Sequence, residues 1–600
     1  MLVTCTVTLV AFTALLPAGP RHPGGASHAQ SPRFVTPFRY AVFEGHWSHV
    51  PDDISGNPTK SGVTDRYEAA LEGLTDHFAI RFTGEVEIPR DGTYLFWTES
   101  DDGSVLRVAG ELVVDNNGLH ARQRREGRIE LAAGRHPFVL TYFEAAGAQS
   151  LTAGVEGPVL AIRALDLPPE ASSVLWYKQP ASVWVEALPI GNGHIGAMVF
   201  GGVIYERLQV NDDSLWAGGA KDRVNPEGHA ALPEVRRLLF AGMVREATQL
   251  AERTMLGVPP RIEPYQPLGD LVLEIPTEEL PVTDYQRQLD LADGVACTRF
   301  RIGEITFTRE AFSSAVDQVL VVRLACDVPG YLDVDIALER SREAITTVSG
   351  PGRLVLEGAC NAGAGMHFRG ELQVVPEGGQ LSSDGTRVLV READAVTLWL
   401  ASATTLKVRE IEAACARQLE RAIEKGYAAV LRDHVAEHRS IFERLTLHLG
   451  TDPHPELPTG ERLAAYRKSP SDPHLEALLF QYGRYLLMGS SRPGTLPANL
   501  QGLWNEEMEP AWNSDFHTNI NLQMNYWLAE VTNLSEMHLP LFDLMQSLVA
   551  PGSDVARRLY GARGWVVHHL TDVWGFAAPA DGIWGMWPRA AEPHPSEEFF

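Results

Sequence analysis

The stretch HTNINLQMNYW, residues 517–527, has residue types and a spacing that could serve chemistry. An imidazole and two amides stand at alternate positions, at His517, Asn519 and Asn521. Alternate side chains of an extended segment point to one side. If this segment is extended, one of its sides is therefore built for hydrogen bonding. The alternative is structural, a polar cap packed beneath the two aromatic residues that end the stretch.

A second candidate set lies in RGWVVHHLTDVWG and DGIWGMWP. Indole rings stack on the apolar face of a sugar, and carboxylates and imidazoles bond its hydroxyls. The residues that could build such a pocket are His568, His569, Asp572, Trp574, Trp584 and Trp587. A packed core with satisfied histidines is the alternative. Adjacent histidines alone do not define a zinc site, so no metal ligand is assigned among them.

A third candidate is a pair of turns, SDDGS at 100–104 and VDNNGLH at 114–120. Carboxylates such as those of Asp101 and Asp102 suit a hard cation like calcium, which can in turn hold sugar hydroxyls. Asp-Gly and Asn-Gly pairs also make ordinary hairpin turns, which is the alternative interpretation.

The composition limits what these candidates could bind. The formal net charge of −26 argues against a nucleic acid, whose phosphates need a basic surface, and suits a neutral ligand. The cysteines beyond residue 5 show no CxxC spacing, which excludes a zinc site and favours buried free thiols. These cysteines are Cys297, Cys326, Cys360 and Cys415.

Residues 1–29 predict a secretory signal peptide, and hence a secreted or periplasmic protein. An apolar stretch from Leu2 to Leu16 precedes Pro and Gly residues, and Ser27-His28-Ala29 fits a small-x-small cleavage site. A buried strand or helix is the alternative. No apolar run reaches ~18 residues, so we expect no membrane-spanning helix.

Several domains must position the candidate residues, because 600 residues exceed what one core usually serves. Residues 34–165 alternate apolar and polar side chains between turns, which predicts a β-sandwich or barrel. Residues 174–405 predict a second, larger β-sandwich with one helical insertion at 231–256. In residues 406–470 and 471–600 the apolar side chains recur at helical spacing, and NLQMNYWLAEVTN is one of the predicted helical segments. The expected fold class is multidomain α+β.

The first zone resembles the protective-antigen (PA-14 type) domain over about residues 34–160. The motifs that carry the resemblance are FRYAVFEGHW, FAIRFTGEVEIPRDGTYLFWTESDDGS, VVDNNGLH and YFEAAGA. That family is a β-sandwich attached to many secreted carbohydrate-active proteins. Asp101 and Asp102 match a pair that holds calcium and a glycan in some members, so the resemblance implies a possible calcium site there.

The rest of the chain resembles glycoside hydrolase family 95 over about residues 174–588. The motifs are WVEALPIGNGHIGAMVFGGVIYERLQVNDDSLWAGGAKDRVNP, YQPLGDLVLEI, LPANLQGLWN and HTNINLQMNYWLAEVTNLSE. The resemblance implies a β-sandwich, a helical linker at 406–470 and an (α/α)6 catalytic barrel from 471. Known members are mostly α-L-fucosidases, with some acting on galactose, so an oligosaccharide or polysaccharide substrate and no required cofactor are implied.

The family hydrolyses the glycosidic bond with inversion of the anomeric configuration. The attacking water is held by Asn side chains that an Asp polarises. By match to the family motif, Asn519 and Asn521 are the implied catalytic amides. An amide oxygen is a weak base, but it can orient water and pass charge to a carboxylate. The residues implied to bind substrate are His517, Trp527, His568, His569, Asp572, Trp584 and Trp587.

Three departures from the family affect the expected activity. Leu570 and Phe576 stand where the family commonly has Asn and Asp. After Pro588 the chain reads RAAEPHPSEEFF, whereas the family's general acid and polarising Asp lie further on. We therefore expect a C-terminally truncated chain with an incomplete barrel and no activity of its own. A non-catalytic carbohydrate-binding protein is the alternative function.

Overall fold

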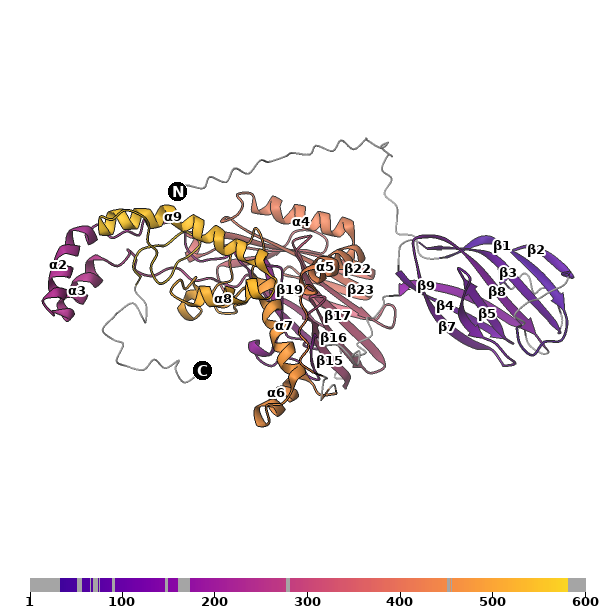
Figure 1. Cartoon of the computed structure of the whole chain (residues 1–600). Coiled ribbons are helices and arrows are strands. Elements are labelled where there is room, and N and C mark those ends of the chain that lie inside the picture. The colour runs from indigo at the N-terminus through magenta and orange to yellow at the C-terminus, as the bar shows by residue number, and fades with distance from the viewer. Residues whose placement is uncertain are drawn as a thin grey trace, which may run out of the picture. The chain divides into compact units, whose positions relative to one another are not determined.

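The computed structural model describes residues 33–50, 57–64, 66–67, 74, 76–88, 92–145, 149–159, 173–276, 281–450, 454 and 456–580. The chain divides into two compact units, Met1–Ala164 and Leu165–Phe600, and each has its own core (Figure 1). The expected signal peptide and the two tryptophans at 584 and 587 lie outside the described residues.

The first unit consists of two antiparallel sheets. Six strands pair in the order β2-β1-β3-β8-β5-β6 and three in the order β7-β4-β9. Aromatic side chains such as Phe82, Phe96 and Tyr142 fill the core between them. The strands are β1 (Arg33–Glu44), β2 (Lys60–Thr64), β3 (Phe78–Ile88), β4 (Gly92–Asp101), β5 (Ser104–Val108), β6 (Glu111–Asn116), β7 (Gln123–Leu131), β8 (Gly134–Glu144) and β9 (Ser150–Val159). The predicted all-β fold of this zone is confirmed.

The second unit is built on one antiparallel sheet of 14 strands, whose main path runs β10-β15-β16-β17-β18-β23-β19-β14-β13-β12-β11. The sheet curls so that β11 and β12 pack against β16, β17 and β18, which makes a sandwich. The strands are β10 (Val174–Tyr177), β11 (Leu188–Gly191), β12 (Ile195–Val199), β13 (Tyr205–Asp212), β14 (Gly269–Glu274), β15 (Val282–Asp290), β16 (Val295–Ile302), β17 (Ile305–Ser314), β18 (Val319–Cys326), β19 (Leu332–Glu339), β20 (Ala344–Val348), β21 (Arg353–Ala359), β22 (His367–Ser383) and β23 (Arg387–Thr404).

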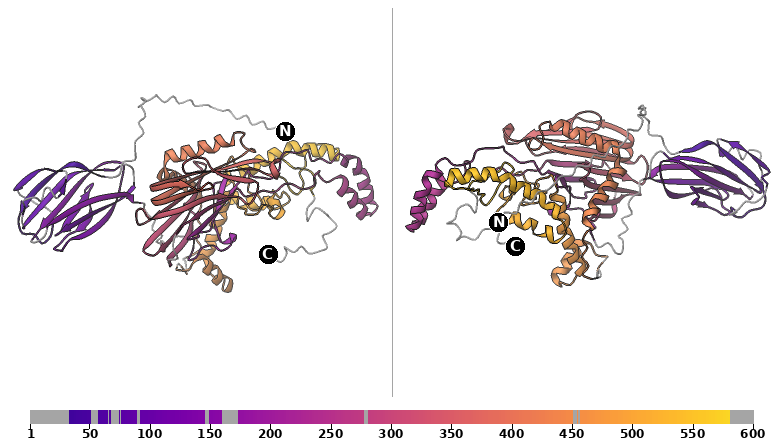
Figure 2. Two further views of the ribbon diagram at one scale, coloured as in Figure 1. Left: turned by 180° about the vertical axis from the view of Figure 1, so that it is seen from behind. Right: turned by 45° about the horizontal axis from the view of Figure 1, so that its top comes forward.

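Helices are inserted into the sheet and follow it. The insertion between β13 and β14 forms a hairpin of two helices, α2 and α3, and α4 packs on β22 and β23 (Figure 2). The helices are α2 (Gly228–Phe240), α3 (Val244–Thr254), α4 (Ile411–Lys425), α5 (Tyr427–Phe442), α6 (Thr459–Lys468), α7 (Pro473–Ser490), α8 (Asn521–Val531) and α9 (Leu539–Tyr560), with short 3₁₀ turns η1 (Trp184–Glu186), η2 (Asn361–Gly363), η3 (Ala511–Ser514) and η4 (Ser535–His538). After residue 471, the described part of the chain holds α7, α8 and α9, which do not close a barrel.

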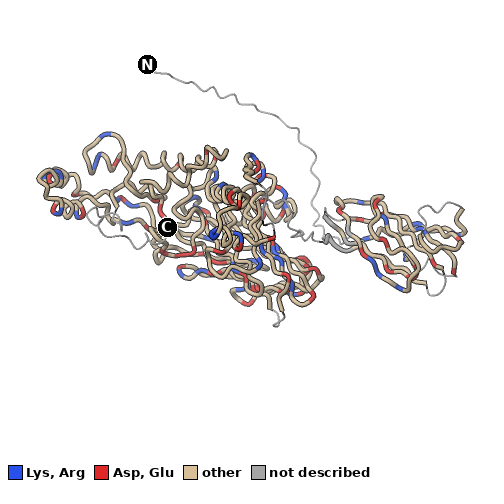
Figure 3. The backbone as a smooth tube through the Cα atoms, turned by 60° about the horizontal axis from the view of Figure 1, so that its bottom comes forward, with Lys and Arg blue, Asp and Glu red and all other residues tan. Residues whose placement is uncertain are grey.

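Charged residues of both signs occur in both units. Lys and Arg are interspersed with Asp and Glu along both units (Figure 3). The four described cysteines are free, and three of them are buried. Burial raises the pKa of the Cys360 thiol to about 11 and that of Cys415 to about 12, so both are inert thiols at neutral pH. Among the described residues, no helix is both long and apolar enough to span a bilayer.

Candidate active site

Two sequence motifs that lie about fifty residues apart in the chain are joined by an antiparallel β-bridge between Phe516 and Thr571. The backbone N–H of Phe516 donates to the carbonyl of Thr571 at 3.2 Å, and that of Thr571 donates back at 3.1 Å. Thr518 N donates to the carbonyl of His569 at 2.9 Å. This pairing brings the imidazoles of His517 and His569 edge to face, with ring centroids 5.7 Å apart. The structure therefore joins these two predicted site residues.

The imidazole of His517 is oriented by Asp515, a residue that the sequence analysis missed. Its Nδ1 lies 2.8 Å from Asp515 Oδ1, and the carboxylate is 1% exposed. Burial raises the pKa of Asp515, although the neighbouring imidazole acts in the opposite direction. A carboxylate at Nδ1 fixes the tautomer that carries its proton there, so Nε2 is left as an acceptor. The sequence did contain a signal for this pair, because an acidic residue two positions before a histidine lies on the same side of an extended segment.

The two candidate catalytic amides are exposed. Asn519 lies in the turn before α8, and Asn521 is the first residue of that helix. No described residue makes a hydrogen bond to either side chain. The helical interpretation of NLQMNYWLAEVTN is confirmed, whereas the extended segment with a single polar face is wrong from Thr518 onward, where the chain turns and then enters α8. Helical geometry instead turns Asn525 inward, where its Nδ2 donates to the carbonyl of Asn499 at 3.0 Å.

The two aromatic residues at the end of the stretch separate. Tyr526 is 2% exposed, and its hydroxyl accepts from Ala498 N at 2.9 Å and lies 2.7 Å from Ser491 Oγ. Trp527 is 63% exposed. The alternative of a polar cap beneath both aromatic residues therefore fails for Tyr526, which is buried and anchors α8, while Trp527 remains available to a ligand.

His568 and Asp572 make their hydrogen bonds with residues other than His517. His568 Nε2 lies 2.7 Å from the hydroxyl of Tyr560, and burial lowers the pKa of its imidazole. Asp572 is 1% exposed, and its Oδ1 accepts the backbone N–H groups of Trp574 at 2.9 Å and Phe576 at 3.1 Å. Burial raises the pKa of the Asp572 carboxyl. Leu570 and Phe576, where the family commonly has polar residues, are both buried.

The sheet of the second unit holds the chain that leads to His517. Trp216, just after β13, packs against Phe516 with ring centroids 5.2 Å apart. Tyr265, before β14, donates its backbone N–H to the carbonyl of Asn513 at 3.0 Å and its hydroxyl to the carbonyl of Leu503 at 2.6 Å, and its own carbonyl accepts from Asn505 Nδ2 at 3.2 Å. Residues next to the sheet strands therefore hold the segment 496–516 in place.

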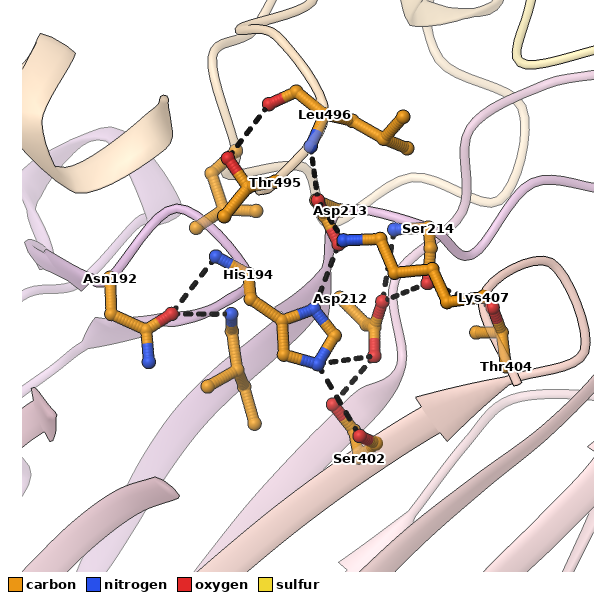
Figure 4. A network of polar contacts seen from close by, with 12 residues as sticks. Asn192, His194, Asp212, Asp213, Ser214, Ser402, Thr404, Lys407, Thr495 and Leu496 are labelled. Carbon is orange, nitrogen blue, oxygen red and sulfur yellow. Dashed lines mark hydrogen bonds and ion pairs between the residues drawn. The ribbon is translucent and has the colours of Figure 1, made fainter. Parts of the chain in front are cut away.

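A buried charge network at the end of β13 fixes the start of that segment (Figure 4). Asp213 lies 2.8 Å from both His194 Nδ1 and Lys407 Nζ, and it accepts the backbone N–H of Leu496 at 2.7 Å. Despite the burial of the carboxyl, these partners hold the pKa of Asp213 at about 2.

The same residues form the one His and Asp cluster among the described residues that has metal-site geometry, made of His194, Asp212 and Asp213. Asp212 accepts from Ser214 Oγ and Ser402 Oγ, both at 2.6 Å. Because hydrogen bonds already satisfy both carboxylates and the Lys407 ammonium sits where a cation would bind, we assign the network a structural role.

In the first unit, both oxygens of the Asp102 carboxylate accept backbone N–H groups, from His120 at 3.2 Å and Ala145 at 3.0 Å. Two acceptors in the same hydrogen-bonded network, Asn116 Oδ1 and Glu144 Oε1, are buried and have no partner in the described part of the chain. Burial raises the pKa of Glu144 to about 7. Unsatisfied oxygens of this kind are the ligands that calcium prefers.

Comparison with known proteins agrees with both resemblances. Residues 39–160 match the PA14 domain, residues 175–408 match the glycosyl hydrolase family 65 N-terminal domain, and residues 426–592 match the glycosyl hydrolase family 95 catalytic domain. The chain is similar to "Alpha-L-fucosidase 2" of Arabidopsis thaliana, at 35% identity over 69% of this chain and 54% of the relative. It is also similar to "Probable alpha-fucosidase A" of Aspergillus niger (strain ATCC MYA-4892 / CBS 513.88 / FGSC A1513), at 34% identity over 72% of this chain and 58% of the relative.

The chain thus spans somewhat more than half the length of these curated relatives. The matches to the sheet and to the helices are consecutive, and they cover the residues that build the site around His517. The chain belongs to glycoside hydrolase family 95, and it carries a PA14 domain at residues 39–160.

Proposed function

We propose that this chain is part of an inverting hydrolase that releases terminal α-L-fucosyl groups from oligosaccharides or polysaccharides. The observation that carries the proposal is the pair of exposed amides, Asn519 and Asn521, next to the oriented imidazole of His517. The names of the curated relatives support fucose as the sugar.

In this proposal the amide oxygens of Asn519 and Asn521 accept hydrogen bonds from the attacking water and orient it. Inverting glycosidases keep their acid and base about 6.5–9.5 Å apart, which leaves room for that water. His517 Nε2 accepts from a sugar hydroxyl, and Trp527 offers its indole face to the sugar ring. We assign the general acid to none of the described residues. Hydrolysis of this kind needs water and acid–base groups and no redox cofactor.

The test is hydrolysis of 2′-fucosyllactose, with the anomer of the released fucose read by NMR. The assay uses the 600-residue chain and, because the curated relatives are longer, a chimera that continues it with a relative's C-terminal sequence. We expect the chimera to release β-L-fucose first. Release of galactose alone would contradict the assignment of fucose as the released sugar. Release of the α anomer would contradict an inverting mechanism. If neither protein hydrolyses the substrate while glycan binding persists, the protein is a carbohydrate-binding one.

We also propose export of the protein, on the residue pattern of 1–29, and a calcium-dependent glycan site in the PA14 domain. Asp101, Asp102 and the unsatisfied oxygens of Asn116 and Glu144 would hold the ion. Calcium there would bridge the protein to vicinal sugar hydroxyls. N-terminal sequencing of the protein recovered from the medium or periplasm tests export, and cleavage after Ala29 is the expected result.

A further inference from the structure

A pocket of about 360 Å³ lies between helix α9 and the insertion that follows β13 in the second unit. Its walls are the loop 221–224 that follows β13, the α9 segment 551–558, and residues 572–578. The volume lies in the range of small-ligand sites. None of His517, Asn519, Asn521 and His569 lines it, so this pocket and the amide pair can be tested separately.

Arg223 is the residue of this pocket whose hydrogen bonding is incomplete. The side chain is well buried, at 7% exposure, and its Nη1 donates to the carbonyl of Arg261 at 2.5 Å. Its guanidinium carbon lies 5.2 Å from the ring centroid of Phe576. Its Nη2 is buried and finds no acceptor among the described residues. A buried donor without a partner is costly, so an acceptor supplied by a ligand would be favourable.

The other charged groups of the pocket are already paired. Arg558 makes two bonds of 3.0 Å to the carboxylate of Asp222 and one of 2.7 Å to Asp554. Lys221 Nζ lies 3.0 Å from Glu263 Oε1. Arg223 and Asp572 are therefore the groups left to meet a ligand.

This arrangement selects a ligand by charge. Arg223 disfavours a cation, while the carboxylates of Asp222, Asp554 and Asp572 disfavour a simple anion. A donor and an acceptor in one pocket suit a group that both accepts and donates hydrogen bonds, as a hydroxyl does. Trp574, which also lines the pocket, offers an indole face to the C–H face of a sugar.

We propose that this pocket binds a neutral, hydroxyl-rich sugar unit, with Arg223 donating to one hydroxyl and Asp572 accepting from another. Arg223 belongs to the insertion between β13 and β14, so this insertion supplies half of the recognition. The inference rests on the proposed function only in taking a glycan as the ligand, and it does not depend on hydrolysis.

The test is calorimetric titration of the full chain with L-fucose and D-galactose. Asn519→Ala and Asn521→Ala are present throughout to remove binding at the amides, and EDTA removes calcium-dependent binding. Arg223→Met and Asp572→Asn should each weaken binding at least tenfold. Arg237→Met is the matched control, because Arg237 is an exposed α2 residue paired with Glu234, and its affinity should equal that of the parent.

Three results would overturn the proposal: no sugar binding by the parent, unchanged binding in both pocket variants, or binding of sulfate that depends on Arg223 in place of sugar. If Arg223→Met does not fold by thermal melting, Asp572→Asn and Trp574→Ala decide by the same tenfold criterion. Failure of the proposed hydrolysis would show in the fucosyllactose assay and leave these affinities unchanged.

Discussion

At the scale of single residues, the pair of Asp515 and His517 explains why the imidazole can serve a neutral ligand. A carboxylate buried to 1% exposure holds Nδ1, and the opposite nitrogen remains an acceptor. The amides beside it carry no charge. A site built from amides and a fixed imidazole can therefore orient water and hydroxyls without drawing a counter-ion.

Asn519→Ala and Asn521→Ala should each lower kcat by about 10²–10³-fold in an active form of the enzyme, with a much smaller change in KM. Contacts to the attacking water matter most in the transition state, and removal of one oriented polar group has an effect of this order. Gln523→Ala is the control, because Gln523 is exposed on the same helix and bonds only the carbonyl of Thr518. A near-normal kcat in both Ala variants would contradict the catalytic role and leave the two amides with a structural one.

The network around Asp213 should be most stabilising between about pH 4 and pH 6.5. The pKa of Asp213 falls from 3.8 to about 2 on folding, so its contribution is present above pH 3.8 and is lost as the pH falls toward 2. Burial opposes the charge of His194, but Asp212 and Asp213 outweigh it and raise the pKa above 6.5. The contribution of His194 is therefore present below pH 6.5 and is lost as the pH rises through its folded pKa.

The measurement is the free energy of unfolding of wild type and Asp213→Asn across this pH range. At pH 6 the variant should be less stable by about 2 kcal/mol or more, from ~1.4 kcal/mol per pKa unit and the loss of partners for His194 and Lys407. The gap should narrow toward pH 2. Asp543→Asn, at an exposed site on α9, is the control. A gap that is independent of pH would contradict the assigned pairing.

At the scale of elements, the sequence analysis succeeded where a pattern is local. Alternation along β3 and β8 and the helical spacing of α4 and α5 are set by which face each element buries. The start of α8 was harder, because polar residues at spacing two also fit the first turns of a helix. Asp213 with Lys407, and Arg223 with Asp572, could not be predicted, because their partners are far apart in the chain.

Tyr526→Phe should lower the free energy of unfolding by about 1–3 kcal/mol, because it leaves the buried N–H of Ala498 without an acceptor. The helix should also loosen, since this hydroxyl ties α8 to the segment 496–516. Chemical denaturation measures the first effect and hydrogen exchange in α8 the second. Tyr331→Phe, at 61% exposure, should change neither. A change below ~0.5 kcal/mol would mean that water replaces the hydroxyl at Ala498.

At the scale of the whole molecule, the two units have separate cores, so residues 33–164 should fold alone. The melting temperature of this isolated fragment should match that of the same unit in the full chain. Calcium should raise that temperature by linkage if the proposed site is present. Asp101→Asn and Asp102→Asn should abolish the rise, and Glu111→Gln, at the exposed start of β6, should keep it. Equal melting temperatures with calcium and with EDTA would leave the turn with a purely structural role.

Translation begins at the N-terminus, so the sheet leaves the ribosome before the chain that it holds. Tyr265 precedes Leu496 by more than two hundred residues, a delay on the order of ten to fifty seconds at ~5–20 residues per second. A sheet rich in distant pairings is slow to form, and that interval gives it time. The segment that leads to His517 then emerges onto a surface that already exists. The order of synthesis therefore matches the order in which the parts of the site depend on one another.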